Sequence, residues 1–219
     1  MAYIVENNGV YGLTKGQFSA TADQGSPSKK GVANQDTAID LAALAITLGA
    51  TFVARSFSGD KTQLVPLIKA AIQHRGAAFI DVISPCIAFN NHPASTKSFD
   101  YVREHNEALN YLDLMIGREP ITHDQASGSI ELLEQHDGSV LKLRKLAPDY
   151  DPTNRLAAMN HLQERQTTGE IVTGLLYVDE DAKDLHDKLK TPLRALNLMD
   201  DADLCPGGGA LERVNAALR

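Results

Sequence analysis

Strand patterns and helix patterns alternate along the N-terminal part of the chain, and this alternation constrains the fold more than any other feature. Short apolar runs rich in β-branched and aromatic residues predict strands at residues 3–6, 51–55 and 77–84. Apolar residues spaced three and four apart predict helices that begin near Asp36 and Asp60, either of which can cap a helix. Because short strand–helix–strand units form right-handed crossovers, the sequence predicts an α/β fold, a mostly parallel sheet with helices on both faces.

The segments that follow the three predicted strands are expected to meet at one edge of the sheet, because parallel strands all end at the same edge. These segments are Asn7–Asn34, Ser56–Asp60 and Pro85–Lys97. The first is far longer than the ~2–6 residues of a usual strand-to-helix connection, and three glycines fall between residues 9 and 16. These features favour a ligand-binding loop. A surface turn or an unstructured excursion without a ligand is the alternative.

After about residue 120 the alternation is less regular. Asp137 and Gly138 predict a hairpin turn between two strands. We expect this part to form a smaller C-terminal appendage on the first lobe rather than a second enzyme domain. Its predicted elements are strands at 129–134, 140–146 and 171–178, and helices at 156–162, 179–189 and 211–218.

Composition excludes several classes of function. The formal charge of -7, from 21 basic against 28 acidic residues, argues against a protein that binds nucleic acid or an anionic membrane by charge. No apolar run reaches the ~20 residues of a membrane-spanning helix. The two cysteines, Cys86 and Cys205, are too far apart for a paired metal motif and too few for a disulfide framework, so a cytoplasmic location is expected.

Cys86 is the residue whose position is most suggestive of chemistry. It follows the third predicted strand, at the sheet edge where the glycine-containing loop is also expected. A lone cysteine most often packs as a small buried hydrophobe. A nucleophilic cysteine would need a base, and the nearest candidate in the sequence is His92. The residues by themselves leave both interpretations open.

Two motifs together resemble a known family. The segment NGVYGLTKGQ, from Asn8 to Gln17, is followed by VISPC at residues 82–86. This combination resembles the β subunits of 2-oxoacid:ferredoxin oxidoreductases, which are thiamine pyrophosphate enzymes. The resemblance covers most of the chain, including residues 55–60 and 150–153, and among subtypes it is greatest to the 2-oxoglutarate type.

The resemblance implies a set of cofactor-binding residues. In the family, thiamine pyrophosphate is held through Mg²⁺ by an aspartate of a GDG motif, an asparagine and a main-chain carbonyl. Asn8 matches the asparagine and Val10 the carbonyl donor, oxygen ligands of the kind that Mg²⁺ prefers. The loop that borders the cofactor and the 2-oxoacid is matched by Leu13, Thr14 and Lys15.

Cys86 matches the last of four cysteines that bind a [4Fe-4S] cluster in the family. The GDG motif and the first three cluster cysteines are absent from the chain, and Cys205 is in the wrong place to replace one. We therefore expect the chain to be the C-terminal part of a β subunit. It carries an incomplete ligand set for a [4Fe-4S] cluster. Residues 1–120 would be the C-terminal part of the thiamine pyrophosphate-binding domain, and residues 121–219 a β-subunit extension.

The family oxidatively decarboxylates a 2-oxoacid, here expected to be 2-oxoglutarate, to acyl-CoA and passes the electrons to ferredoxin. The implied partners are an α subunit, ferredoxin, coenzyme A and the 2-oxoacid. Because the family's acid–base glutamate belongs to the α subunit, no catalytic residue is assigned in this chain, and the chain alone is expected to be inactive. A non-catalytic interaction module that kept the fold without the cofactors is the alternative, and a thiol enzyme using Cys86 is a weaker one.

Overall fold

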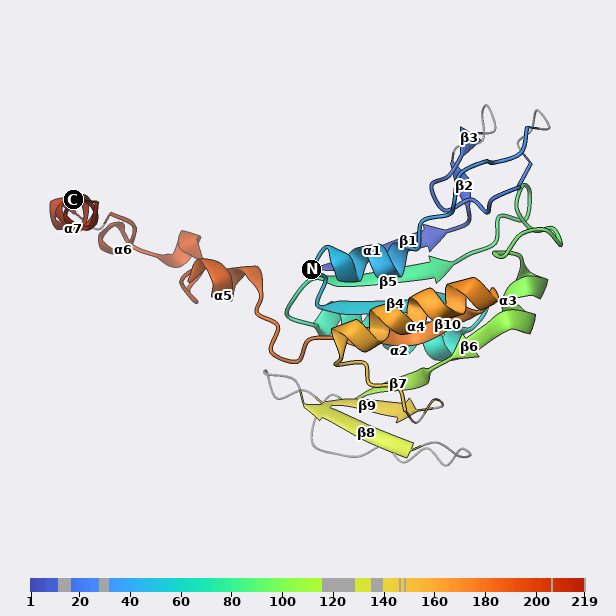
Figure 1. Ribbon diagram of the computed structural model, residues 1–219. Helices are drawn as coiled ribbons and strands as arrows, with labels where there is room; N and C mark the ends of the chain where they lie inside the picture. The colour runs from blue at the N-terminus through green and yellow to red at the C-terminus, as the bar shows by residue number, and fades with distance from the viewer. Residues whose placement is uncertain are drawn as a thin grey trace. The chain divides into compact units, whose positions relative to one another are not determined.

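The computed structural model divides the chain into two compact units, Met1–Ala182 and Lys183–Arg219 (Figure 1). The structure describes residues 1–11, 17–27, 32–115, 129–134, 140–145, 147, 149–205 and 207–218. No described helix combines the length and the apolar character needed to cross a membrane.

A five-stranded sheet forms the centre of the first unit. Its strands, in spatial order, are β1 (Ala2–Asn7), β5 (Ala78–Ile83), β4 (Phe52–Phe57), β10 (Ile171–Val178) and β6 (Asn106–Ala108). The first three run parallel, β10 is antiparallel to β4, and β6 is parallel to β10. The predicted mostly parallel α/β sheet is therefore confirmed.

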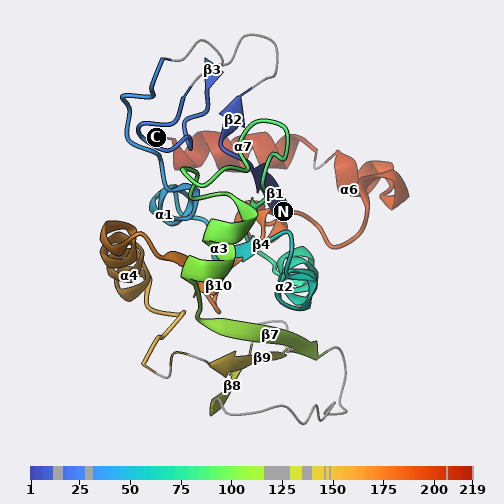
Figure 2. The same ribbon diagram turned by 90° about the vertical axis from the view of Figure 1, so that its right-hand side faces the viewer.

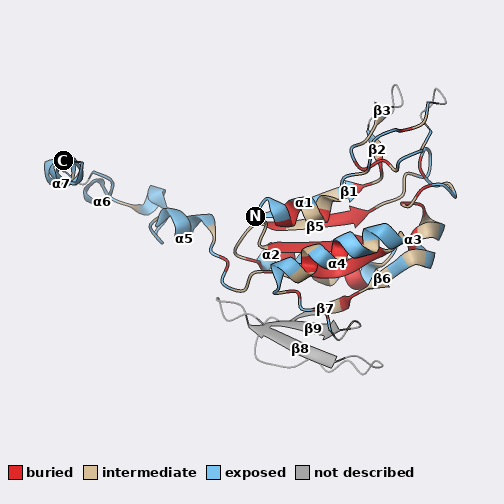
Figure 3. Ribbon diagram, viewed as in Figure 1, coloured by how far each residue is buried: buried red, intermediate tan, exposed pale blue. Residues whose placement is uncertain are grey.

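Helices cover both faces of this sheet. On one face, α1 (Leu41–Thr47) and α4 (Arg155–Thr168) pack on a core that includes Val53 and Leu176. On the other face, α2 (Lys61–Gln73) packs on a core that includes Phe52. Figure 2 shows α1 and α4 on the opposite side of the sheet from α2. Every residue of β4 is buried (Figure 3), as expected for a strand covered on both sides.

Capping residues explain where the first helices begin. Asp60 caps α2 as predicted, because its side chain accepts hydrogen bonds from the Thr62 and Gln63 N–H groups. The expected start of α1 at Asp36 is wrong. The helix begins at Leu41, since Asp40 is the residue whose carboxylate accepts the Ala43 N–H.

The predicted hairpin pairing is confirmed in a second, three-stranded sheet. Its order is β7 (Asn110–Met115), β9 (Val140–Lys145) and β8 (Ser129–Glu134), and both pairs are antiparallel. The Asp137–Gly138 turn lies outside the described residues.

The strand predicted at residues 171–178 is β10, and it completes the main sheet together with the helix α4 that precedes it. The predicted boundary of the family domains at residue 120 stays a prediction.

Short elements complete both units. In the first unit these are β2 (Val10–Tyr11), β3 (Gln17–Phe18) and α3 (Phe99–His105). The second unit contains α5 (Leu185–Leu189), η1 (Leu196–Leu198), α6 (Asp201–Leu204) and α7 (Gly208–Ala217). Of the helix predicted at residues 179–189, only the last five residues are helical, because Asp184 forms the capping box that starts α5.

Candidate functional site

The carboxyl ends of three parallel strands lie together at one edge of the main sheet. Asn7, Ile83 and Phe57 are aligned in register as the last residues of β1, β5 and β4. The two chain segments that leave β1 and β5 meet at once, because the Ser84 N–H donates to the Asn7 carbonyl at 3.0 Å. This edge therefore brings together the two segments that carry the sequence motifs.

A tight turn follows β1. The Asn8 side-chain Oδ1 accepts a hydrogen bond from the Val10 N–H at 2.9 Å, and Gly9 between them has a φ of 68°. A Cβ on Gly9 would lie 2.6 Å from Asn90 Nδ2 and 3.0 Å from Lys97 Cδ. Only glycine combines the left-handed backbone with the absence of a side chain that this turn requires.

Asn90 joins this turn to the Cys86 loop. Its side-chain Nδ2 donates to the Asn8 carbonyl at 2.8 Å, and its backbone N–H donates to the Cys86 carbonyl at 2.7 Å. Asn90 itself is buried, at 6% exposure. The predicted residues Asn8 and Cys86 are thus held in one hydrogen-bonded assembly. The sequence does not single out Asn90, since an asparagine in a polar loop carries no distinct signal.

The remaining predicted residues fall into two groups. Val10 is described, and it pairs with Phe18 in the short β2–β3 ladder. Leu13, Thr14 and Lys15 lie outside the described residues, so their roles stay predictions. Cys86 is half-buried and Cys205 is exposed.

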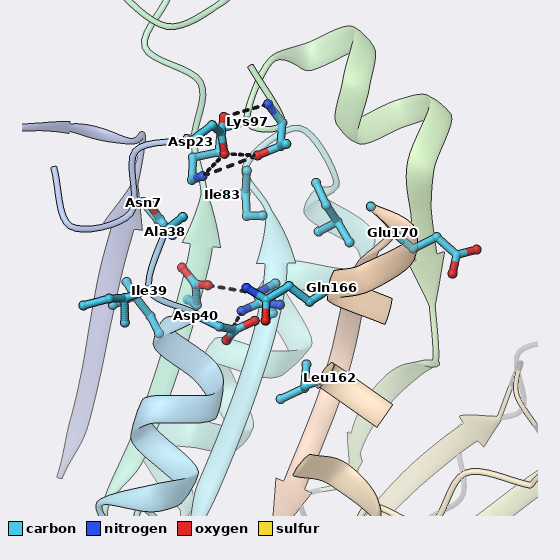
Figure 4. Close-up of a pocket in the computed structure, with 16 residues that line it drawn as sticks. Asn7, Asp23, Ala38, Ile39, Asp40, Ile83, Lys97, Leu162, Gln166 and Glu170 are labelled. Carbon is cyan, nitrogen blue, oxygen red and sulfur yellow. Dashed lines mark hydrogen bonds and ion pairs between the residues drawn. The ribbon is translucent and has the colours of Figure 1, made fainter. Parts of the chain in front are cut away.

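A cavity of about 170 Å³ opens beside this assembly, on the face of the sheet covered by α1 and α4 (Figure 4). Its centre is a buried ion-pair group. The Arg55 guanidinium contacts Asp40 Oδ1 at 2.6 Å and Asp81 Oδ2 at 2.9 Å. Sixteen residues line the cavity: Asn7, Asp23, Ala38, Ile39, Asp40, Leu41, Arg55, Asp81, Ile83, Thr96, Lys97, Leu162, Gln166, Gly169, Glu170 and Ile171.

The charges of this group support one another. Burial by itself lowers the pKa of Arg55, but the Asp40 and Asp81 charges outweigh burial, so the pKa is raised above its ordinary value. Burial by itself raises the pKa of Asp40, but the Arg55 charge and the helix N–H groups outweigh it, so the pKa is lowered. Arg55 and Asp40 are therefore both ionised at neutral pH.

A second ion pair fastens the long loop over the cavity. Asp23 accepts hydrogen bonds from the Thr96 N–H at 2.9 Å, the Thr96 hydroxyl at 2.6 Å and Lys97 Nζ at 3.1 Å. Figure 4 shows Asp23 and Lys97 facing each other at the top of the cavity. These bonds join the segment after β3 to the segment after Cys86. Residues 17–27, which are the part of the long loop that contains Asp23, therefore have a defined position.

Two family models match parts of the chain. Residues 1–82 match the family model described as thiamine pyrophosphate enzyme, C-terminal TPP binding domain. Residues 140–192 match the model for the C-terminal region of the pyruvate ferredoxin oxidoreductase β chain. In these regions the chain is similar to β subunits of 2-oxoacid:ferredoxin oxidoreductases.

Curated proteins similar to this chain include archaeal and bacterial ones. A 2-oxoacid:ferredoxin oxidoreductase subunit beta from Sulfolobus sp is 48% identical over 92 residues, which is 42% of this chain and 30% of that protein. The 2-oxoglutarate oxidoreductase subunit KorB of Mycobacterium tuberculosis is 38% identical over 99 residues, 45% of this chain and 25% of that protein. The matched region thus spans about a third or less of these relatives.

A solved structure shares the fold. It is a 2-oxoglutarate:ferredoxin oxidoreductase from Magnetococcus marinus with 2-oxoglutarate, coenzyme A and succinyl-CoA bound. The TM-score is 0.59 at 23% sequence identity, and the match covers 90% of this chain and 55% of that chain.

The described residues of this chain fit Mg²⁺ in part. In the part of the chain that the structure describes, Asn8 Oδ1 accepts one hydrogen bond and keeps a second lone pair, which suits a hard cation that takes oxygen ligands. Within the described ranges, however, no three or more His, Cys, Asp or Glu side chains gather in a way that could hold a metal ion. Among the described residues, Asn8 Oδ1 is therefore offered as one oxygen ligand and not as part of an acidic cluster.

A complete [4Fe-4S] site does not fit this chain. Such a cluster takes four thiolate ligands, and the sequence has only two cysteines. Cys205 belongs to the second compact unit, whereas Cys86 belongs to the first. Even with both cysteines as ligands, at least two further thiolates would have to come from outside these 219 residues.

Proposed function

We propose that this chain forms part of the β subunit of an oxidoreductase that oxidatively decarboxylates 2-oxoglutarate to an acyl-CoA and reduces ferredoxin. One observation carries the proposal. The Asn8 turn, in a region that matches a thiamine pyrophosphate-binding domain, is held by Asn90 against the Cys86 loop at the carboxyl ends of the parallel strands. Ligands of open α/β sheets bind at this edge.

The proposed cofactors are thiamine pyrophosphate with Mg²⁺, and a [4Fe-4S] cluster to which this chain contributes Cys86. When bound, thiamine pyrophosphate supplies the carbanion chemistry of decarboxylation. Asn8 Oδ1 and the Val10 carbonyl would each offer Mg²⁺ one oxygen ligand. Leu13, Thr14 and Lys15 would border the cofactor and the 2-oxoacid, with the Lys15 charge complementing a carboxylate or a diphosphate.

The proposed partners are an α subunit, ferredoxin and coenzyme A, in the cytoplasm. Several relatives are named as 2-oxoglutarate synthase or oxidoreductase subunits, which supports 2-oxoglutarate as the 2-oxoacid. Because the other cluster thiolates come from outside this chain, the chain alone should not turn over.

Reconstitution tests the proposal. The chain is combined with an α subunit and with the β-subunit segment that carries a GDG motif, and reduction of a viologen dye is followed with coenzyme A and either 2-oxoglutarate or pyruvate. We expect dye reduction that depends on the 2-oxoacid and is faster with 2-oxoglutarate. Asn8→Ala should lower the rate by more than the about 10–100-fold that loss of an outer-shell partner of a metal ligand costs.

Asn160→Ala is the matched control, because Asn160 is an exposed asparagine on α4 in the same unit. Its rate should equal that of the unmodified chain. Full activity in Asn8→Ala would reject the Mg²⁺ assignment, and dye reduction independent of any 2-oxoacid would reject the reaction.

The alternative function is a non-catalytic interaction module. It is favoured by the single cysteine in the first unit. Calorimetric titration of the chain with Mg²⁺ and thiamine pyrophosphate separates the two proposals. Micromolar binding by the chain alone would count against the non-catalytic module.

A further inference from the structure

The cavity beneath the Asp23–Lys97 pair contains a carboxylate oxygen without a partner. Asp81 is 1% exposed, and its Oδ2 accepts a hydrogen bond from Arg55 Nε. Its Oδ1 is buried and has no hydrogen-bond partner among the described residues. A bare carboxylate oxygen in the interior is costly, so a native structure that keeps one needs a group that occupies the neighbouring space.

The charges around Asp81 indicate what that group is. Arg55 is shared by two carboxylates, Asp40 and Asp81. Of the other charged groups on the wall, Lys97 pairs with Asp23, and Glu170 pairs with Arg165, which also contacts Glu107. Arg55 therefore compensates only one of the two negative charges of Asp40 and Asp81. A water molecule would donate a hydrogen bond to Oδ1 but would not compensate the other charge. A cation would bind the Oδ1 lone pair and also compensate the charge.

The size and the ligand set restrict the cation. The cavity of about 170 Å³ has room for a small ion with a few waters, at about 30 Å³ for each water. Asn7 also lines the cavity, and among the described residues its Oδ1 accepts a hydrogen bond only from the Thr21 hydroxyl, which leaves one lone pair. Within the part of the chain that the structure describes, no cluster of three acidic, His or Cys ligands could hold a metal ion. A monovalent ion fits this sparse ligand set better than a divalent one.

We propose that this cavity binds a small monovalent cation of about the size of ammonium, with Asp81 Oδ1 as its charged ligand and Asn7 Oδ1 as a neutral one. The site does not depend on the proposed enzymatic function. Its role is to compensate the buried charge between α1 and the sheet, at the point where Asp40 caps the helix and contacts Arg55.

Thermal unfolding of the full chain tests the site. The cation of the buffer salt is changed from choline to ammonium, K⁺ or methylammonium at constant ionic strength. We expect the melting temperature to rise and then saturate with at least one of the small cations, because a ligand that binds only the folded state stabilises it. The three cations distinguish an inorganic ion from a primary ammonium group.

Asp81→Asn removes the charge but keeps the shape and an oxygen for Arg55. We expect this variant to lose affinity for the cation by about tenfold or more, while Asp149→Asn, an exposed carboxylate of the same unit, behaves like the unmodified chain. Two results would overturn the site: no saturable cation effect on the unmodified chain, or an equal effect on Asp81→Asn.

Crystals soaked with Tl⁺ provide a second measurement that does not need a variant to fold. An anomalous peak beside Asp81 Oδ1 is expected. An ordered water at that position, without an anomalous signal, would overturn the proposal.

Discussion

Gly9 and Asn90 show how single residues define the candidate site. The turn after β1 needs a left-handed residue at position 9, and the space where its side chain would lie is filled by Asn90 and Lys97. The sequence indicates a special backbone here, because glycines are frequent in this loop. It does not indicate the neighbour at position 90, since 82 residues separate Asn90 from the Asn8 carbonyl to which it donates.

Replacing Gly9 by alanine should destabilise the chain more than the same change at Gly25. Both glycines have positive φ, 68° and 83°, but nothing lies within 4 Å of a Cβ at Gly25. Both variants should lose about 1–2 kcal/mol to backbone strain, and Gly9→Ala should lose about 1–3 kcal/mol more through the clash. Urea unfolding measures the difference. Equal losses would show that the turn relaxes away from Asn90.

Asn90→Ala should loosen the Asn8 turn. The variant removes the buried donor to the Asn8 carbonyl, so we expect a loss of about 1–3 kcal/mol in the free energy of unfolding. Hydrogen exchange at the Val10 amide, which donates to Asn8 Oδ1, should become faster.

The control for Asn90→Ala is Asn91→Ala. Asn91 accepts a hydrogen bond from the Phe99 N–H instead, away from the turn. If both variants changed Val10 exchange alike, Asn90 would have no specific effect on the turn.

The start of α1 depends on one carboxylate with two partners. Asp40 caps the helix through the Ala43 N–H and also contacts Arg55 in β4. The sequence pattern predicts the helix start at Asp36, because Ile39 fits the apolar spacing that continues into the helix. The contact with Arg55, 15 residues further along the chain, adds a reason for Asp40 that no local pattern contains.

Asp40→Asn should make the free energy of unfolding depend less steeply on pH under acidic conditions. The pKa of Asp40 is lowered in the folded chain, so its ionised form contributes stability above the unfolded pKa of about 3.9. That contribution is lost as the pH falls through the lowered folded value. Stability of the unmodified chain should therefore fall more steeply below about pH 4 than that of Asp40→Asn.

Unfolding by urea at several pH values measures these slopes. Asp36→Asn is the control, because Asp36 is an exposed carboxylate in the same loop. Its free energy of unfolding should fall with pH as steeply as that of the unmodified chain. An equally steep fall in Asp40→Asn would contradict the role of Asp40.

The two compact units differ in how much they bury. The first unit holds two cores, one on each face of the main sheet. In the second unit, α5, η1, α6 and α7 contain no buried residue. Cooperative stability in a protein comes mainly from buried apolar surface, so it should reside in residues 1–182.

A chain that ends at Ala182 should unfold with nearly the same free energy as the full chain, within about 0.5 kcal/mol, the usual range for changes away from buried features. Urea unfolding of both chains, with circular dichroism as the signal, provides the comparison. A loss of several kcal/mol in the shortened chain would show that residues 183–219 stabilise the sheet.

The sequence by itself determined the α/β class, the parallel strands β1, β4 and β5, the hairpin strands β8 and β9, and the two motifs of the candidate site. These follow from local periodicity and from residue types, which neighbours in the chain carry. Only the tertiary structure decided that β10 lies antiparallel to β4, that Asp81 meets Arg55, and that Asn90 joins the Asn8 turn to the Cys86 loop. The physical reason is that these contacts join residues far apart in the sequence, so their energy depends on which surfaces the packed sheet brings together.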